Sequence, residues 1–284
     1  MTTHGLARSY LYVPGDRPDR LAGALTRGAD ALIADLEDAV GPGHKRAARE
    51  HVRAWLDLES GDGPQRWVRI NADTVDTDLD AVVTTALTGV VVPKSEPARL
   101  DAVDTVLGQL EAERGLAAGS VAVLPLLESG LGIQRVAEVA AAPRVLRLGV
   151  GEVDLASDLG LTLDAERTIL NPLRLSIVVA SAAAGISRPV APTSTAFRDL
   201  ETFRRSAETL RRMGFRGRTA IHPGQLSVIH DVFTPSEDEI AAARDLLTRF
   251  DAADGGGFVH ADGTFADLAN IRNARETLAL AGQR

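Results

Sequence analysis

The sequence contains no cysteine among its 284 residues. This absence excludes disulfides, thiolate nucleophiles and thiolate-bound metals. Aromatic residues make up only 4% of the chain, which argues against the stacked aromatic platforms that bind nucleic acid bases. Long basic runs are missing as well, and the formal net charge is −8, so we expect no nucleic acid partner.

Long apolar runs are also absent. No stretch approaches 18 uninterrupted apolar residues, so the sequence predicts no membrane span. The opening stretch MTTHGLARSYLYVPG lacks the apolar core that precedes the cleavage site of a secretory signal. We therefore expect a cytoplasmic protein without a membrane partner. Hydrophobic residues still make up 45% of the chain, which is enough for a large core.

Short apolar runs of β character alternate with stretches in which apolar residues recur at helical spacing. Eight such runs are present, at residues 9–14, 31–37, 66–71, 89–94, 121–128, 145–150, 188–193 and 218–223. No G-x-G-x-x-G dinucleotide fingerprint follows the first run. The alternation predicts an α/β protein, a (β/α)8 TIM barrel, in preference to an open doubly wound sheet.

About sixty residues follow the eighth run. Ser236 and Glu239 have the spacing of a capping box at the start of a helix, and a hairpin-like loop and a last helix follow. We therefore expect a catalytic barrel over residues 1–235. Residues 236–284 should form a C-terminal extension that covers a barrel mouth, either its own or that of a neighbouring subunit.

Carboxylates follow several of the predicted strands. In a barrel these positions face the catalytic mouth, where close unpaired carboxylates repel each other. A divalent cation removes this repulsion, and ligation by one or two carboxylates plus water is typical of Mg²⁺. We therefore predict that Glu128 and Asp154 hold Mg²⁺. The alternatives are a cap, a salt bridge or a solvated side chain for Glu128, and a helix N-cap for Asp154.

Other polar residues also stand near strand ends. Arg69 could be a surface residue or a partner of Asp35, and His222 is best interpreted as a hydrogen-bonded residue beside a rigid proline. Arg17 and Arg20 fall in the first turn of a predicted helix, where basic side chains oppose the helix dipole. They are either solvated or serve an anionic ligand.

A series of characteristic segments follows in order from about residue 8 to residue 275. They are RSYLYVPGDRPDRLAGAL, ADALIADLEDAV followed by KRAAR, RWVRIN, VVVPK, LPLLES, GEVDLASDLG, GFRGRTAIHPGQ and VFTPSEDEI. Together these segments resemble the citrate lyase beta subunits. The wider group includes malyl-CoA and citramalyl-CoA lyases, which are aldolase-type barrels.

The resemblance implies a Mg²⁺-dependent lyase that acts on a 3-hydroxyacyl thioester. It assigns the metal to Glu128 and Asp154 and the substrate carboxylate to Arg69. It places Glu37 and Asp38 near the metal waters. Other roles implied by the resemblance are coenzyme A binding by Arg17 and Lys45, and an acid or base crossing to a neighbouring subunit, Asp267.

Two positions depart from the family pattern. Ala269 stands where the family commonly has proline after the "DL" pair, which affects the setting of Asp267. Ser194 replaces the acid of the family's "AP-x-D", which changes the substrate pocket.

Three functions are compatible with these residues. The favoured one is a lyase that splits malyl-CoA, citramalyl-CoA, citryl-CoA or a relative into an acyl-CoA and a 2-keto acid or glyoxylate. The second is a malate synthase or malyl-CoA thioesterase on the same fold. The third is a citrate lyase complex subunit acting on a thioester of an acyl carrier protein. Apolar positions in the tail, together with the resemblance, predict a homotrimer or a dimer of trimers. A purely binding module is least favoured.

Overall fold

The computed structural model describes residues 7–58, 63–252, 258–259, 265–266 and 268–282. The chain divides into two compact units, residues 1–230 and 231–284. None of the helices in the described part of the chain combines the length and the apolar character that crossing a bilayer requires.

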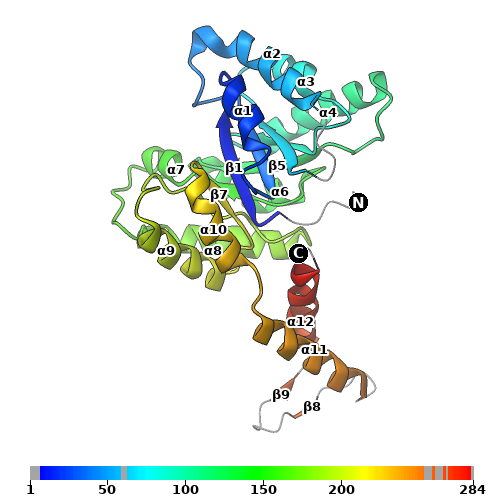
Figure 1. Cartoon of the computed structure of the whole chain (residues 1–284), viewed down its shortest axis with the longest axis vertical. Helices are drawn as coiled ribbons and strands as arrows, with labels where there is room; N and C mark the ends of the chain where they lie inside the picture. Colours follow the sequence, from blue (N-terminus) through cyan, green and yellow to red (C-terminus); the bar gives the residue numbers. More distant parts are fainter. Residues whose placement is uncertain (1–6, 59–62, 253–257, 260–264, 267, 283–284) are drawn as a thin grey trace. The chain divides into compact units, whose positions relative to one another are not determined.

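The first unit is built on an all-parallel sheet of seven strands in the order β6-β5-β4-β3-β2-β1-β7 (Figure 1). The strands are β1 Ser9–Pro14, β2 Ala31–Asp35, β3 Gln65–Arg69, β4 Gly89–Val92, β5 Ala122–Leu127, β6 Gly149–Val150 and β7 Arg218–Ala220. Parallel strands need crossover connections, and helices supply most of them here.

The predicted closed (β/α)8 barrel is wrong. The sheet is a curled, open half-barrel, because the expected strand 188–193 contributes only a one-residue bridge, Ala191 with Arg218. Pro189 and Pro192 in this segment have no N–H to donate, so a regular ladder cannot form. The remaining donors still find acceptors: the Val190 N–H donates to the Leu148 carbonyl at 2.8 Å.

The buried Arg147 occupies this irregular region. Its guanidinium donates to the Ala7 carbonyl at 2.9 Å, the Arg188 carbonyl at 2.9 Å and also the Arg216 carbonyl. The same guanidinium lies 5.7 Å from the centre of the Tyr10 ring. Buried carbonyls without partners are costly, so one arginine side chain supplies donors where the β-ladder stops.

Helices follow the strands along the chain. Those of the first unit are α1 Pro18–Ala24, α2 Lys45–Leu56, α3 Val75–Val82, α4 Pro97–Glu113, α5 Gly130–Gln134, α6 Val136–Ala141, α7 Glu152–Asp158, α8 Asn171–Ala183, α9 Leu200–Met213 and α10 Leu226–Phe233, which continues past the boundary. Short 3-10 turns are η1 Pro42–His44, η2 Thr168–Leu170 and η3 Pro223–Gln225. Neighbouring helices α1 to α4 contact one another in chain order, forming a row outside the sheet (Figure 1).

The concave side of the sheet is filled by alternate side chains of the strands. Trp67 is fully buried there, and its ring meets Tyr10 edge to face with centroids 6.0 Å apart. Gly89, on the adjoining strand, makes this possible. A Cβ at Gly89 would collide with Cζ3 of Trp67 and lie 2.5 Å from the Ala122 carbonyl oxygen. The pairing of a large residue with glycine fixes how closely β3 and β4 approach.

The second unit consists of α11 Glu237–Ala252, the antiparallel pair β8 Phe258–Val259 and β9 Phe265–Ala266, and α12 Leu268–Ala281. The Ser236 hydroxyl accepts from the Glu239 N–H at 3.1 Å, and the Glu239 carboxylate accepts from the Ser236 N–H at 2.8 Å. This confirms the predicted capping box. Helices α11 and α12 contact each other.

Substituting Gly89→Ala tests the close packing under β4. The added methyl group cannot fit beside Trp67 and the Ala122 carbonyl, so the free energy of unfolding should fall by about 1–3 kcal/mol. Gly23→Ala, in α1 with nothing within 4 Å of the new Cβ, is the matched control and should raise it by about 0.4–1 kcal/mol. Urea unfolding measures both, and equal effects would contradict the packing argument.

Candidate active site

The register of the sheet brings polar side chains to one edge. Asp35 at the end of β2 lies opposite Arg69 at the end of β3. Leu127 lies opposite Val150, so Glu128 and the start of α7 follow adjacent strands at the same edge. A cavity of about 480 Å³ opens at this edge and is lined by Asp35, Arg69, Glu128 and Asp154, among other residues.

Asp35 organises the turn that follows β2. Its side chain is buried, and its two oxygens accept from the backbone N–H groups of Glu37 at 2.9 Å and Ala39 at 3.1 Å. The same carboxylate accepts a bidentate pair from Arg69, from Nε at 2.7 Å and Nη2 at 2.5 Å. Two charge-assisted bonds of this geometry fix both side chains in place. The pairing of Arg69 with Asp35 is one of the alternatives that the sequence left open.

The remaining nitrogen of Arg69, Nη1, lies close to two further carboxylates. Nη1 lies 2.8 Å from Oε2 of Glu37, outside hydrogen-bond geometry, and donates to Oδ2 of Asp38 at 3.2 Å. The guanidinium also lies 5.1 Å from the centre of the Tyr12 ring. A substrate carboxylate can therefore reach Arg69 at Nη1 only by competing with Glu37 and Asp38.

Glu128 lines the cavity and is buried, with 5% of its surface exposed. Oε1 accepts from the Lys94 N–H at 2.7 Å, and Lys94 adopts a positive φ of 46°, which is uncommon outside glycine. A Cβ at Gly151 would overlap Oε2 of Glu128, so glycine at this position leaves room for the carboxylate. Backbone features on both sides therefore position Glu128.

Asp154 lies in the first turn of α7, but it does not cap the helix, because Gly151 occupies the N-cap. Within the described residues Asp154 makes no hydrogen bond or ion pair. Its negative charge acts on Glu128 instead. Burial raises the pKa of Glu128 to about 7, and the hydrogen bond from the Lys94 N–H opposes this rise. The negative charge of Asp154 raises the pKa of Glu128 further.

Glu37 is in a similar situation. Burial raises the pKa of Glu37 to about 7, and the charges of Asp38, Glu128 and Asp35 raise it further, while Arg69 lowers it. Neighbouring carboxylates that resist ionisation are the arrangement that a divalent cation relieves. Glu128 and Asp154 fit Mg²⁺, which takes one or two protein carboxylates and keeps several waters. In the described ranges, no three or more His, Asp or Glu side chains surround one metal position.

The predicted coenzyme A residues are placed differently from one another. All three N–H bonds of the Lys45 ammonium are used within the chain, by the carbonyls of Leu36 and Glu37 at 2.6 Å each and by Oδ1 of Asn71 at 2.7 Å. A ligand could engage Lys45 only by breaking these bonds. Arg17 pairs with Asp19 at 3.3 Å and does not line the cavity.

Three residues singled out from the sequence remain to be placed, namely Asp267, His222 and Arg20. Asp267 lies outside the described residues. His222 accepts from the Gly224 N–H at 3.0 Å and stacks on Phe197 with ring centroids 5.0 Å apart, in keeping with the structural interpretation. Arg20 does line the cavity.

Tyr12 and Arg167 are two of the cavity-lining residues that the sequence did not indicate. Tyr12 lies within a predicted strand, where alternation marks it only as a core candidate, and its ring packs against Arg69. Arg167 lies in the loop between α7 and α8, far along the sequence from the end of any strand. The expectation that site residues directly follow strands could therefore not indicate it. Only the charged or polar neighbours of Tyr12 and Arg167 could have indicated a role in the site, and these neighbours are known only from the folded structure.

The family model described as HpcH/HpaI aldolase/citrate lyase matches residues 8–223. A (3S)-malyl-CoA thioesterase from Cereibacter sphaeroides is 34% identical over 280 residues, covering 96% of this chain and 94% of the relative. Citrate lyase subunit beta of Escherichia coli is 32% identical over 285 residues, covering 96% and 93%.

A solved structure is also similar. It is CitE from Mycobacterium tuberculosis in complex with magnesium, acetoacetate and coenzyme A, with a TM-score of 0.76 and 29% identity. The similarity covers 98% of this chain and 99% of CitE.

Magnesium affinity should depend on pH because two of these carboxylates hold protons near neutrality. The ordinary pKa of 4.5 is raised to about 7 at Glu37 and Glu128, so between these values the folded protein binds protons that the unfolded chain has lost. Stability without metal should therefore fall as pH rises through this window, whereas Mg²⁺ affinity should rise by about tenfold per pH unit per proton released.

Calorimetry in two buffers of different ionisation enthalpy measures the proton release. We expect release near pH 6 and almost none above pH 8. Affinity that stays constant from pH 5.5 to 7 would show that these carboxylates are already ionised without metal.

Proposed function

The chain belongs to the HpcH/HpaI aldolase/citrate lyase family, and on that premise we propose that it is a Mg²⁺-dependent carbon–carbon lyase of 3-hydroxyacyl-CoA thioesters. Its products would be acetyl-CoA or a related acyl-CoA and a 2-keto acid or glyoxylate. The observation that carries this proposal is the pair Glu128 and Asp154 in the same cavity as Arg69. Relatives named citrate lyase subunit beta support the lyase class, and CitE with magnesium and coenzyme A supports both ligands.

Each step of the cleavage has a candidate group on this chain. The substrate's hydroxyl and neighbouring carboxylate would be oriented over Glu128 and Asp154, with the carboxylate reaching Nη1 of Arg69. Bound Mg²⁺ would supply Lewis acidity there and neutralise the two protein carboxylates. A pKa of about 7 suits Glu37 to accept the hydroxyl proton as the carbon–carbon bond breaks.

The electron pair of the broken bond passes to the thioester, forming its enolate. A proton must then be given to the enolate carbon. Asp267 is the candidate donor by resemblance, and it lies in a segment outside the described residues. The hydroxyl-bearing carbon leaves as the keto acid or glyoxylate, which balances the reaction without an oxidant or reductant.

A thioesterase is the second candidate, because a (3S)-malyl-CoA thioesterase is 34% identical over nearly the whole chain. It would hydrolyse the same thioester to free coenzyme A. The lyase proposal has a further form, in which this protein is a subunit of a complex and acts on a thioester of an acyl carrier protein. The relative from E. coli is named as a subunit, which supports this form. Incubation with Mg²⁺ and a panel of 3-hydroxyacyl-CoA esters separates them: acyl-CoA plus keto acid indicates a lyase, and free thiol indicates a thioesterase.

Removing one metal carboxylate tests the proposed centre. Glu128→Gln and Asp154→Asn should each lower turnover at least about a thousandfold and weaken Mg²⁺ binding, because only one of the two protein carboxylates then remains. Far-UV circular dichroism should stay unchanged. Glu113→Gln, at an exposed position of α4, is the matched control and should retain full activity. A variant that binds Mg²⁺ normally would remove its carboxylate from the centre.

Arg69→Lys keeps the positive charge but loses the planar fork. Both the bidentate bond to Asp35 and the Nη1 position would be lost, so kcat/KM should fall by about a hundredfold or more. Thermal unfolding separates a folding defect from a catalytic one. If kcat/KM stays within about threefold of the unaltered protein, Arg69 does not bind the substrate.

Subunit sharing is tested by mixing two inactive variants. We propose a homotrimer or a dimer of trimers in which Asp267 reaches a neighbour's site, so Asp267→Ala and Arg69→Ala subunits refolded together should regain part of the activity. Some mixed sites then receive both intact residues. A monomer by light scattering at micromolar concentration, or mixtures as inactive as either variant, would refute this arrangement.

A further inference from the structure

One wall of the cavity carries a buried glutamate held by two arginines. Glu152, the first residue of α7, is 3% exposed. Its Oε1 accepts from Nε of Arg174 at 2.7 Å, and its Oε2 accepts from Nη1 of Arg167 at 2.9 Å. Both carboxylate oxygens are therefore engaged by guanidinium groups.

Positive charge is in excess around this glutamate. Arg218 is buried nearby, and burial lowers its pKa to about 9, with Arg174 and Arg167 adding to the effect and Glu152 opposing it. Arg167 and Arg174 bond to the Glu152 carboxylate, whereas the Arg218 guanidinium donates to the Pro192 and Phe203 carbonyls and to the Ser206 hydroxyl. We call Glu152 and these three arginines the cationic cluster. An anion bound beside it would gain energy without displacing any existing partner.

Arg167 is the arginine of the cluster that lines the cavity. Its side chain is 21% exposed, and in the described part of the chain its Nε and Nη2 make no hydrogen bond. The corresponding edge of Arg69, by contrast, is filled by Asp35. Arg167 therefore offers the two parallel donors that bind a carboxylate bidentately.

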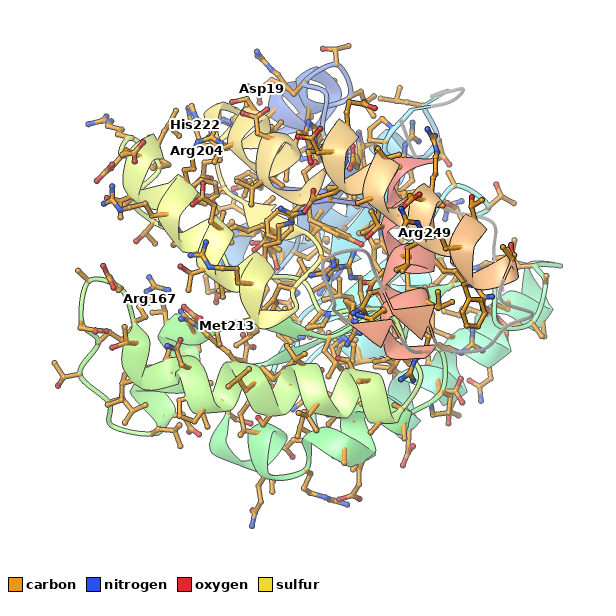
Figure 2. The ribbon with its side chains drawn as sticks, turned by 90° about the horizontal axis from the view of Figure 1, so that it is seen from below. Asp19, Arg167, Arg204, Met213, His222 and Arg249 are labelled. Atoms are coloured by element: carbon orange, nitrogen blue, oxygen red, sulfur yellow. The ribbon has the colours of Figure 1, made fainter. Side chains whose placement is uncertain are left out.

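The loop holds Arg167 in an unusual conformation. Its φ of 54° and ψ of 38° are left-handed, which is uncommon for residues other than glycine. Asp164 stabilises the loop by accepting from the Thr168 N–H at 2.8 Å and hydroxyl at 2.6 Å. Figure 2 shows Arg167 on this loop between α7 and α8. Such strain points to a positioned side chain.

The cationic cluster borders the proposed metal position without belonging to it. Glu152 and Asp154 both line the cavity from the first turn of α7, and Arg167 lines the same cavity. A substrate bound at Asp154 can therefore extend a second group toward Arg167. Thr193 and Thr195 also line the cavity and carry no negative charge that would compete for Arg167.

We propose that the free edge of Arg167 binds a second carboxylate of the substrate, carried on the substituent of the hydroxyl-bearing carbon. The keto-acid product would then be a dicarboxylate, with one carboxylate at the metal and the other at Arg167. This inference rests on the proposed lyase function and adds the substrate class to it.

The test compares two keto acids that differ by this one carboxylate. Oxaloacetate and pyruvate are titrated calorimetrically into the Mg²⁺-loaded protein. Oxaloacetate should bind at least about tenfold more tightly, since a charged hydrogen-bond pair is at stake. Arg167→Asn should lower oxaloacetate affinity by about tenfold or more and change pyruvate affinity less than about twofold. Asparagine tolerates the left-handed conformation, and Glu152 keeps its bond to Arg174.

Two controls accompany this variant. Arg167→Lys keeps the charge without the fork and should give an intermediate loss. Arg205→Asn, which removes an exposed arginine of α9 paired with Glu201, should change neither affinity.

Several outcomes would overturn the proposal. The first is equal affinity of the unaltered protein for both keto acids. The second is an equal loss of affinity for both keto acids in Arg167→Asn. The third is an Arg167→Asn variant that binds coenzyme A more weakly but keeps the keto-acid preference, because the anion bound by Arg167 would then be a phosphate. If the unaltered protein cleaves a hydroxyacyl thioester yet shows no preference that depends on Arg167, only this inference fails. If it cleaves none and binds neither keto acid, the proposed function fails as well.

Discussion

Repulsion between carboxylates at the carboxyl edge of the sheet is the constraint that shapes this site. In the described part of the chain, all the ion pairs of these acids go to one guanidinium, that of Arg69. Burial first and the neighbouring carboxylates second raise the pKa values of Glu37 and Glu128 to about 7, although the charge of Arg69 opposes the rise at both groups. The acids concerned are Asp35, Glu37, Asp38, Glu128 and Asp154. A protein built in this way is adapted to bind a cation, whose binding energy then adds to its stability.

The architecture around these acids keeps them from relaxing apart. Strand register sets Asp35 against Arg69, and Asp35 in turn holds the backbone that carries Glu37. Lys45 holds the same turn by donating to two of its carbonyls, and Lys94 donates its N–H to Glu128 from a left-handed conformation. Each contact uses a backbone group or a fully engaged side chain, so the spacing of the acids is fixed by the fold rather than by their own charges.

Much of this could be predicted from the sequence, because β-type runs and their terminal acids are local patterns. The strands around residues 9–14 and 31–37, and the acids Glu128 and Asp154, follow directly from such patterns. The open sheet could not be predicted from alternation alone: residues 188–193 have strand character, but Pro189 and Pro192 cannot donate.

The sequence offered the Arg69–Asp35 pair only as one alternative, and most other side-chain partners could not be predicted from it. Arg69 is the carboxylate-binding residue by resemblance, but a partner 34 positions away, Asp35, fills its bidentate edge. Arg167 has no sequence signal, because its importance comes from Glu152 and Arg174, which meet it only after folding. The cavity therefore has two regions of opposite charge, acidic toward Asp154 and cationic toward Arg167. A ligand that complements both must present a metal-chelating end and an anionic end, and that combination selects among substrates more sharply than the cavity's volume can.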